Sequence, residues 1–333
     1  MGRHLFKWVL LVGLCMTLCG CVRPRDEYQE RVRRTEERNA RLPQPNDEDR
    51  SYWLKNMIWH HRFSNAEVTA AAGLNSFEIA KYCEKYDIRP NNKPKRPDSA
   101  PLLALPYPGG RHPRIGFLDG AIDPQRETKV SIFTPWDDSS YVVVDVPEAI
   151  WSNFGLMYLA HTHVATMWDD QGLTLEKLEW NRNTDGSLTM SRWLPNKVSF
   201  HAKVQPERDR VLFALALRNL SELTVSDLRV QVCTLLKGAK GFNSQTSENK
   251  LHKKPYIACR NDAGDKWIIT AWTECIRTWD NPPCPCMHSD PQLPDCPPNE
   301  LRRVRGALWF YQGEDIDGEI RRLDGTDWRD AAM

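Results

Sequence analysis

The sequence predicts a mostly β protein, a large antiparallel β-sandwich preceded by a small N-terminal helical hairpin. The segment NKVSFHAKV alternates strictly, placing Val198, Phe200, Ala202 and Val204 on one face of a strand. Two further apolar segments, VLFALAL and LRVQVCTLL, follow after polar links of hairpin length, which predicts three successive antiparallel strands. No long amphipathic helical pattern interrupts the strand candidates, so the body is expected to be a sandwich.

The first residues carry the pattern of an export signal. Arg3 and Lys7 precede an apolar run, Val9 to Leu18, that is too short to span a bilayer. The sequence LCGC that follows resembles a bacterial lipobox, which implies a lipoprotein signal peptide over residues 1–20 and lipidation of Cys21. The expected location is therefore the bacterial cell envelope, on the periplasmic face or in the outer membrane. The alternative is an ordinary signal peptide that is cleaved nearby.

Residues 21–50 are almost wholly polar and predict a charged tether without an apolar face. Residues 51–88 predict a hairpin that is similar to a helix-turn-helix, with one capping box formed by Ser64 and Glu67 and a second by Asn75 and Glu78. A Pro-rich linker over 89–103 follows.

DNA binding by this hairpin is disfavoured, because an exported chain meets no promoter and the second helix mixes acids with its lysines. Without Arg3 and Lys7 the chain has 43 basic and 44 acidic residues, a formal charge of −1. This balance gives no electrostatic reason to expect nucleic acid as a partner.

The sandwich is expected over residues 104–324, with a Cys/Pro-rich loop over 275–298 that leaves no room for regular structure and a C-terminal tail over 325–333. Further strand candidates outside the three central ones are 130–133, 141–146, 156–163, 173–180, 187–193, 267–272 and 303–311.

The strand series has a known counterpart. The stretch LPNKVSFHAKVQPERDRVLFALALRNLSELTVSDLRVQVC, with its Asn219-Leu220-Ser221 turn, resembles the core of galactose-mutarotase-like β-sandwich (supersandwich) proteins. This resemblance implies a fold used by sugar epimerases, polysaccharide-processing domains and non-catalytic sugar binders. The family's epimerases pair a catalytic His with a Glu on a late strand, and the usual Asn-His-aromatic signature is absent from this sequence.

Two histidines are the first candidates for chemistry. In LAHTHVATMWDD, His161 and His163 point to the same side of a strand, where they could bind a metal or serve as acid and base. Asp169 follows closely, and Glu179 is a candidate second carboxylate. The competing interpretation is a hydrogen-bonded pair of histidines on an outer face.

Aromatic and basic residues are candidates for sugar binding. The chain has 13 tryptophans, of which Trp136, Trp168 and Trp193 are the predicted stacking residues, although most tryptophans in a sandwich pack in the core. Candidate substrate-binding cations are Arg111 and Arg114 in a Gly-rich connection and Arg192 beside Trp193.

Cysteines near the C-terminus allow two interpretations. Export and lipidation leave seven cysteines, and an oxidising compartment favours disulfides. The disulfide candidates are Cys259, Cys275, Cys284, Cys286 and Cys296. The second choice is a structural zinc bound by Cys284, Cys286, His288 and Cys296.

The leading hypothesis is an exported, lipid-anchored protein that binds or processes carbohydrate at an aromatic-rich cleft without a cofactor, and the structural zinc remains the second choice behind disulfides. The sequence does not decide whether the protein is an enzyme. One alternative is a non-catalytic envelope protein that holds a protein partner. Another is a metal-dependent hydrolase that uses His161, His163 and an aspartate.

Overall fold

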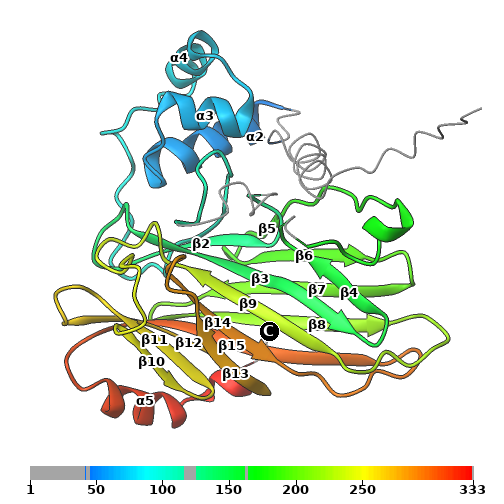
Figure 1. The fold of residues 1–333 in the computed structure, drawn as a ribbon. Helices are drawn as coiled ribbons and strands as arrows, with labels where there is room; N and C mark the ends of the chain where they lie inside the picture. The colour runs from blue at the N-terminus through cyan, green and yellow to red at the C-terminus, as the bar shows by residue number, and fades with distance from the viewer. Residues whose placement is uncertain (1–41, 43–45, 116–124, 162–163, 332–333) are drawn as a thin grey trace, which may run out of the picture.

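The computed structural model describes residues 42, 46–115, 125–161 and 164–331. In this part of the chain two antiparallel sheets pack face to face, and a small helical unit lies against one end (Figure 1). The predicted fold class, a mostly β sandwich with a small N-terminal helical element, is confirmed. Among the described residues no helix combines the length and the apolar character needed to cross a membrane.

The first sheet, called sheet A, has seven strands in the described chain, in the order β1-β2-β3-β9-β14-β13 with β4 paired to β3. Its strands are β1 (Ala104–Pro106), β2 (Lys129–Phe133), β3 (Tyr141–Ser152), β4 (Gly155–Leu159), β9 (Arg229–Leu235), β13 (Cys275–Asp280) and β14 (Cys286–Pro291).

The second sheet, called sheet B, has eight strands among the described residues, in the order β10-β11-β12-β15-β8-β7-β6-β5. Its strands are β5 (Asn181–Arg182), β6 (Leu188–Trp193), β7 (Val198–Pro206), β8 (Arg210–Asn219), β10 (Lys250–Lys253), β11 (Tyr256–Arg260), β12 (Lys266–Trp272) and β15 (Leu301–Gln312).

One predicted pairing is wrong. β7 and β8 pair antiparallel as expected, but β9 leaves this sheet and pairs with β3 and β14 in sheet A. The link from Leu220 to Leu228 therefore crosses between the two layers instead of turning a hairpin. Asn219 anchors the start of this link, because its amide donates hydrogen bonds to the carbonyls of Leu223 and Cys296.

The main core fills the space between the inner faces of the two sheets. Every second residue of β7 faces it, from Val198 to Val204, as the alternation predicts. Opposite them lie residues of sheet A such as Val142, Val144 and Ile150. Since burial of apolar area is the main favourable term in folding, this shared core fixes which face of each sheet points outward.

The helical unit contains α2 (Asp47–Lys55), a π-helical turn (Asn56–His60), α3 (Asn65–Ala72) and α4 (Ser76–Lys85). Both predicted capping boxes are present, Ser64 with Glu67 at the start of α3 and Asn75 with Glu78 at the start of α4. The helical part begins earlier than residue 51, because Asn46 caps α2 and the first turn of α2 is acidic.

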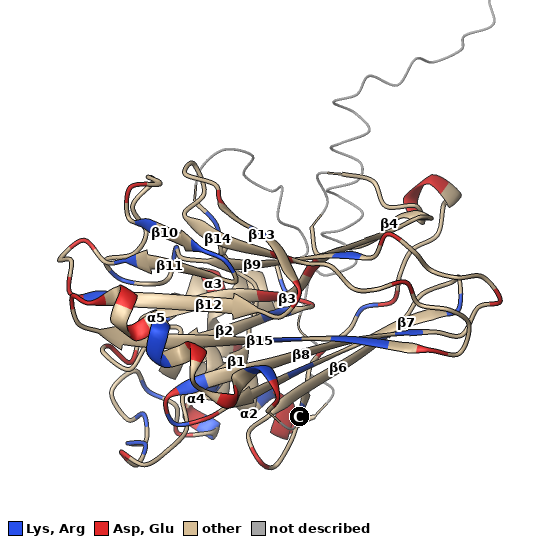
Figure 2. Cartoon of the chain, turned by 90° about the horizontal axis from the view of Figure 1, so that it is seen from below, with Lys and Arg blue, Asp and Glu red and all other residues tan. Residues whose placement is uncertain are grey.

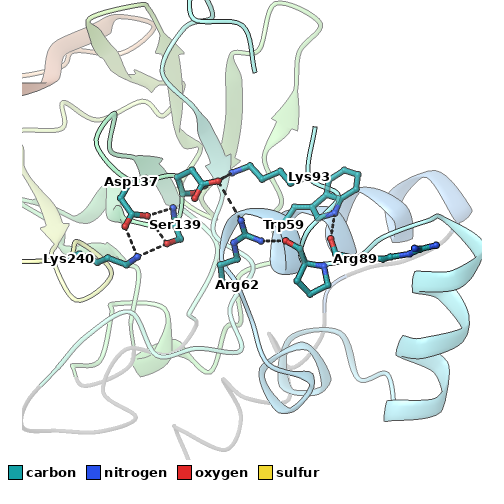
Figure 3. A network of polar contacts seen from close by, with 9 residues as sticks. Trp59, Arg62, Arg89, Lys93, Asp137, Ser139 and Lys240 are labelled. Carbon is teal, nitrogen blue, oxygen red and sulfur yellow. Dashed lines mark hydrogen bonds and ion pairs between the residues drawn. The ribbon is translucent and has the colours of Figure 1, made fainter. Parts of the chain in front are cut away.

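Polar contacts fasten this helical unit to the sandwich (Figure 3). Asp138 forms an ion pair with Lys93 at 2.9 Å and a second, longer one with Arg62 at 3.5 Å. Beside them, Lys240 pairs with Asp137 at 2.6 Å. Loops of the sandwich thus hold the helical unit over the edge of sheet A.

The C-terminal part contains more regular structure than the sequence indicates. Helix α5 (Ile316–Asp324) covers the outer face of sheet B through Ile320 and Leu323, with acidic side chains in its first turn and basic ones in its last (Figure 2). The short turn Asp327–Arg329 buries Trp328 on the same face, within the predicted tail 325–333.

Two further expectations about regular structure are wrong. The predicted loop 275–298 contains the paired strands β13 and β14. Its prolines are compatible with this pairing, because they lie in the connecting turn and from the end of β14 onward, where they break no ladder hydrogen bond. Residues 173–180 form no strand, since the chain there runs without a partner in either sheet.

Candidate functional site

A row of chemically active side chains crosses the outer face of sheet A. The strand register places Lys129, Asp145, Cys233, His288 and Trp279 opposite one another on five neighbouring strands. Directly opposed residues in a sheet lie close enough for their side chains to interact. The row is therefore one continuous cluster, although its members come from distant parts of the sequence.

A bulge in β3 adds a carboxylate to this cluster. Val146 and Ile150 face the core, so strict alternation would direct Glu148 into the core as well. The register between β3 and β9 shifts between Asp145 and Ala149, and this irregularity turns Glu148 to the outer face. Bulges are a common means of redirecting one side chain without breaking the sheet.

Glu148 connects two histidines. Its Oε1 lies 2.8 Å from Nε2 of His161, and its Oε2 lies 3.3 Å from Nε2 of His288. The Gln231 amide donates a further hydrogen bond to Oε2. Burial would raise the pKa of Glu148, but His288 and His161 outweigh it and hold the pKa well below its usual range. Glu148 is therefore an ionised carboxylate with fixed partners.

His288 is held on both ring edges and on one face. Its Nδ1 lies 3.6 Å from the Cys286 sulfur, and its ring stacks on Trp279 with centroids 3.7 Å apart and planes within 5°. Burial opposes the charged form, but Cys286 and Glu148 outweigh it and raise the pKa of His288 to about 10. The orientation of this imidazole is thus fixed by its surroundings.

Three buried thiols adjoin His288. Cys233 is on β9, Cys286 is on β14, and Cys284 is in the turn that precedes β14. Burial raises the pKa of Cys233 to about 12, and the hydrogen bond that the Cys286 thiol donates to Cys233, together with burial, raises the pKa of Cys286. These sulfurs pack with Tyr141, Val143 and Leu235 in an apolar cluster on the outer face.

The predicted disulfides are not formed, since all seven cysteines of the described chain are free thiols. Cys259, Cys275 and Cys296 belong to the core between the sheets, whereas Cys284 and Cys286 belong to the outer cluster. Sheet A separates the two groups. For the same reason the predicted ligand Cys296 lies apart from Cys284, Cys286 and His288. Cys233 lies beside these residues in its place.

A cavity of about 310 Å³, called here the outer-face cavity, opens beside this cluster. Its polar wall includes Arg114, Glu148, His161, Gln231 and His288. The residues that complete the lining are mostly apolar, aromatic or sulfur-bearing: Trp151, Leu156, Leu159, Val164, Cys233, Leu235, Trp279, Asn281, Cys284 and Cys286. Cavities with an apolar wall and a few convergent polar groups are typical ligand sites.

Of the predicted catalytic residues, the structure brings His161 to this cavity. Strand β4 ends at Leu159, so His161 follows the strand, and His163 lies outside the described residues. Asp169 caps a short turn by accepting hydrogen bonds from Thr166, away from the cavity. Glu179 pairs with Arg126 elsewhere on the sandwich.

The predicted sugar-binding residues are dispersed. Arg114 lines the cavity, but Trp168 is buried in the core, where its indole donates a hydrogen bond to the Met157 carbonyl. Trp136 packs on Phe242 at the core margin. Three more lie elsewhere, each with a different environment: Arg192 is buried against Glu127, Trp193 is exposed on sheet B, and Arg111 is paired with Glu67.

Arg111 lines a second cavity of about 390 Å³ between the helical unit and sheet A. This cavity is rich in cations, and three of them are paired with carboxylates. Arg111 pairs with Glu67, Arg62 with Asp138 and Lys240 with Asp137. We therefore regard it as an interface between two parts of the chain.

Sequence reasoning missed Glu148, Gln231 and Cys233. A signal for Glu148 was present, since it follows the apolar stretch YVVVDVP and a carboxylate buried in such a strand requires partners. No comparable signal marks Gln231 or Cys233, because their role depends on which strand lies beside them.

Comparisons with known proteins give low similarity. No family model matches the chain, and no curated protein matches it. Solved structures with partial likeness include one from the human microbiome that carries the name kojibiose phosphorylase (8% identity, TM-score 0.32, 67% of this chain and 34% of that one). This chain therefore spans about a third of that protein.

Two further solved structures show similarly low similarity. A protein from Escherichia coli K12 that carries the name aldose 1-epimerase has 13% identity and a TM-score of 0.31, over 53% of this chain and 84% of that one. The heparan sulfate lyase HepC from Pedobacter heparinus has 10% identity and a TM-score of 0.32, over 81% and 43%. These values are too low to assign a function to this chain.

Proposed function

We propose that the chain binds a carbohydrate in the outer-face cavity. The observation that carries this proposal is the lining of the cavity, in which Trp151 and Trp279 lie together with Glu148, His161 and Gln231. A sugar presents apolar C–H groups beside a ring of hydroxyls, and this cavity offers aromatic surface beside fixed hydrogen-bonding groups. Its volume lies near the lower end for ligand sites and suits one or two sugar units.

The polar groups are positioned before any ligand arrives. Glu148 has both oxygens engaged, so His161 and Gln231 are held in single orientations. Groups that need no reordering lose little conformational entropy on binding. Arg114 adds a cation at the rim, which would favour a sugar that carries a carboxylate or sulfate.

His161 is the side chain that we propose for any processing step. Its Nε2 is bonded to Glu148 at 2.8 Å, an arrangement in which a carboxylate orients an imidazole for proton transfer. Glu148 would act as a positioning residue, because its low pKa makes it a weak base. A His161→Gln variant would keep binding and lose turnover.

The test is binding of the full chain to a panel of neutral and acidic oligosaccharides, followed by calorimetric titration of the strongest ligand. We expect Trp151→Ala and His161→Ala to weaken binding at least tenfold. Trp193→Ala is the matched control, because Trp193 is an exposed tryptophan on the opposite sheet. Equal binding by all three variants, or no binding by the native chain, would refute the proposal.

We also propose that the chain is exported and lipid-anchored through Cys21, on the strength of the lipobox-like LCGC sequence. Cys21 lies outside the described residues. Metabolic labelling with an alkyne fatty acid in a bacterial host tests this: the native chain should be labelled and Cys21→Ala should not. Labelling of the variant would contradict the assignment.

A further inference from the structure

Three ligand-type atoms converge on the outer face of sheet A. The sulfurs of Cys233 and Cys286 and a ring nitrogen of His288 all lie within 4.8 Å of one another, and each residue is buried. Tetrahedral zinc with its usual bond lengths places such ligand atoms about 3.3 to 3.8 Å apart. The separation of 3.6 Å between the Cys286 sulfur and Nδ1 of His288 already lies in this range.

The His288 ring is oriented as metal-binding imidazoles usually are. Its Nδ1 faces the Cys286 sulfur at 3.6 Å, and its Nε2 faces Glu148 at 3.3 Å. A ligating histidine commonly donates its other N–H to a carboxylate, which fixes the tautomer and increases the basicity of the ligand nitrogen. Here the carboxylate is itself held by His161 and Gln231.

A fourth ligand is close by. Cys284 is buried, and its thiol is hydrogen-bonded to Cys286. It belongs to the turn before β14, whose backbone can move more easily than a strand in the middle of the sheet. Arg114 is near enough to act on Cys284 electrostatically. Three thiolates on a divalent ion leave one negative charge in excess, and Arg114 would compensate it.

We propose that Cys233, Cys286 and His288, with Cys284 as the fourth ligand, bind a zinc ion at the floor of the outer-face cavity. Soft thiolates with one imidazole in a tetrahedral set select zinc over magnesium or calcium. Binding displaces the proton of each thiol and any proton on Nδ1 of His288. The proton on Nε2 remains, and this N–H donates a hydrogen bond to Glu148.

This inference is independent of the carbohydrate proposal. A zinc ion at this position would join β9 to β14 and would fix the wall of the cavity through His288 and Trp279. Loss of sugar binding with metal retained, or the reverse, would separate the two proposals. A disulfide between any two of Cys233, Cys284 and Cys286 would remove two of the proposed ligands, so the free thiols must be counted alongside the metal measurement.

The experiment is a cobalt titration of the full chain, purified under reducing conditions and freed of metal with a chelator. We expect one equivalent of Co²⁺ to give the intense visible bands of a tetrahedral site and a thiolate-to-cobalt charge-transfer band, and Zn²⁺ to displace it. Cys233→Ser, Cys286→Ser and His288→Gln should each lower the affinity by at least a hundredfold. Cys259→Ser and Cys296→Ser are matched controls in the core, and they should bind like the native chain.

Two milder variants test the finer assignment. Cys284→Ser should keep one equivalent of cobalt with a weaker charge-transfer band, and an unchanged band would remove Cys284 from the site. Glu148→Gln should weaken binding about 10- to 100-fold without changing the stoichiometry. Both replacements are close in size to the native side chains, so a thermal melt of the metal-free forms checks that they fold.

Two results on the native chain alone would overturn the proposal. One is the absence of zinc, by elemental analysis, from protein purified without chelator, combined with no cobalt spectrum. The other is an intact mass after alkylation without reductant that shows Cys233 or Cys286 already paired in a disulfide. Neither result depends on the folding of a variant.

Discussion

Because His61 is buried, we predict that the folded chain loses stability in mild acid. The side chain is 1% exposed, and its ring nitrogens lie 3.1 Å from the Asn56 carbonyl and 2.7 Å from the Ser131 hydroxyl. Nδ1 therefore carries the proton and donates to the carbonyl, and Nε2 accepts from the hydroxyl. Burial, with His60 and Arg111 adding to it, lowers the pKa of His61 from 6.5 to about 3.

The sign follows from the lowered pKa. Below pH 6.5 this imidazole is protonated in the unfolded chain but stays neutral in the folded chain until the pH approaches 3. The stability of the folded chain from this group is therefore complete above pH 6.5 and decreases as the pH falls towards 3. The linkage relation gives a loss of about 2 kcal/mol in the free energy of unfolding between pH 7 and pH 5 from this one group.

The assay is urea unfolding at pH 7 and pH 5 of the native chain and two variants. His61→Asn removes the titrating group and keeps a donor near the Asn56 carbonyl, so its pH-dependent loss should be smaller by about 2 kcal/mol. Ser131→Ala is the control, because it removes the hydroxyl donor and keeps the imidazole. It should cost about 0.5–1.5 kcal/mol at both pH values and retain the full pH dependence.

The reasoning would be refuted if His61→Asn lost as much stability between pH 7 and pH 5 as the native chain. That result would mean that His61 takes up its proton in the folded state, or that the helical unit opens before the sandwich unfolds.

Three further predictions concern stability. Lys129→Met should cost about 3–5 kcal/mol in urea unfolding, because it removes a 2.9 Å ion pair and leaves the buried Asp145 without its cation, and simultaneous replacement of Asp145 by Asn should recover part of that loss. Gly306→Ala should cost about 1–3 kcal/mol, since a Cβ there would meet the Trp272 ring at 2.4 Å, and a wild-type melting temperature would show that the ring moves freely. Ser64→Ala should cost about 0.5–2 kcal/mol by removing one half of a capping box, whereas Ser64→Asp should cost little; equal losses in both would argue against capping.

The local features of the fold could be predicted from the sequence. The alternation over residues 198–204 and the two capping boxes are determined by neighbouring residues, and the structure contains them as expected. Partner choice could not be predicted, because β9 has the same apolar pattern whether it joins β8 or β3. The Cys/Pro-rich segment was misjudged since its prolines suggested a loop, while β14 gains its regularity from pairing with β9 and β13.

The candidate site was predicted in part. His161 and Arg114 are in the cavity, and Cys284, Cys286 and His288 adjoin it. Glu148 was missed because a bulge reverses the direction that alternation gives it. Trp168 was assigned to the site by its sequence neighbours, but the chain turns after β4 and packs that indole into the core.

The row of side chains across sheet A also has a consequence for the order of folding. Its members come from β2, β3, β9, β14 and β13, so the row is complete when the last of these strands has docked. Contacts between residues so far apart in the chain close late and slowly, because the intervening loops must first be ordered. Protection of the Cys233 thiol from a fast alkylating reagent would therefore time the final assembly of the sheet, separately from the formation of its local hairpins.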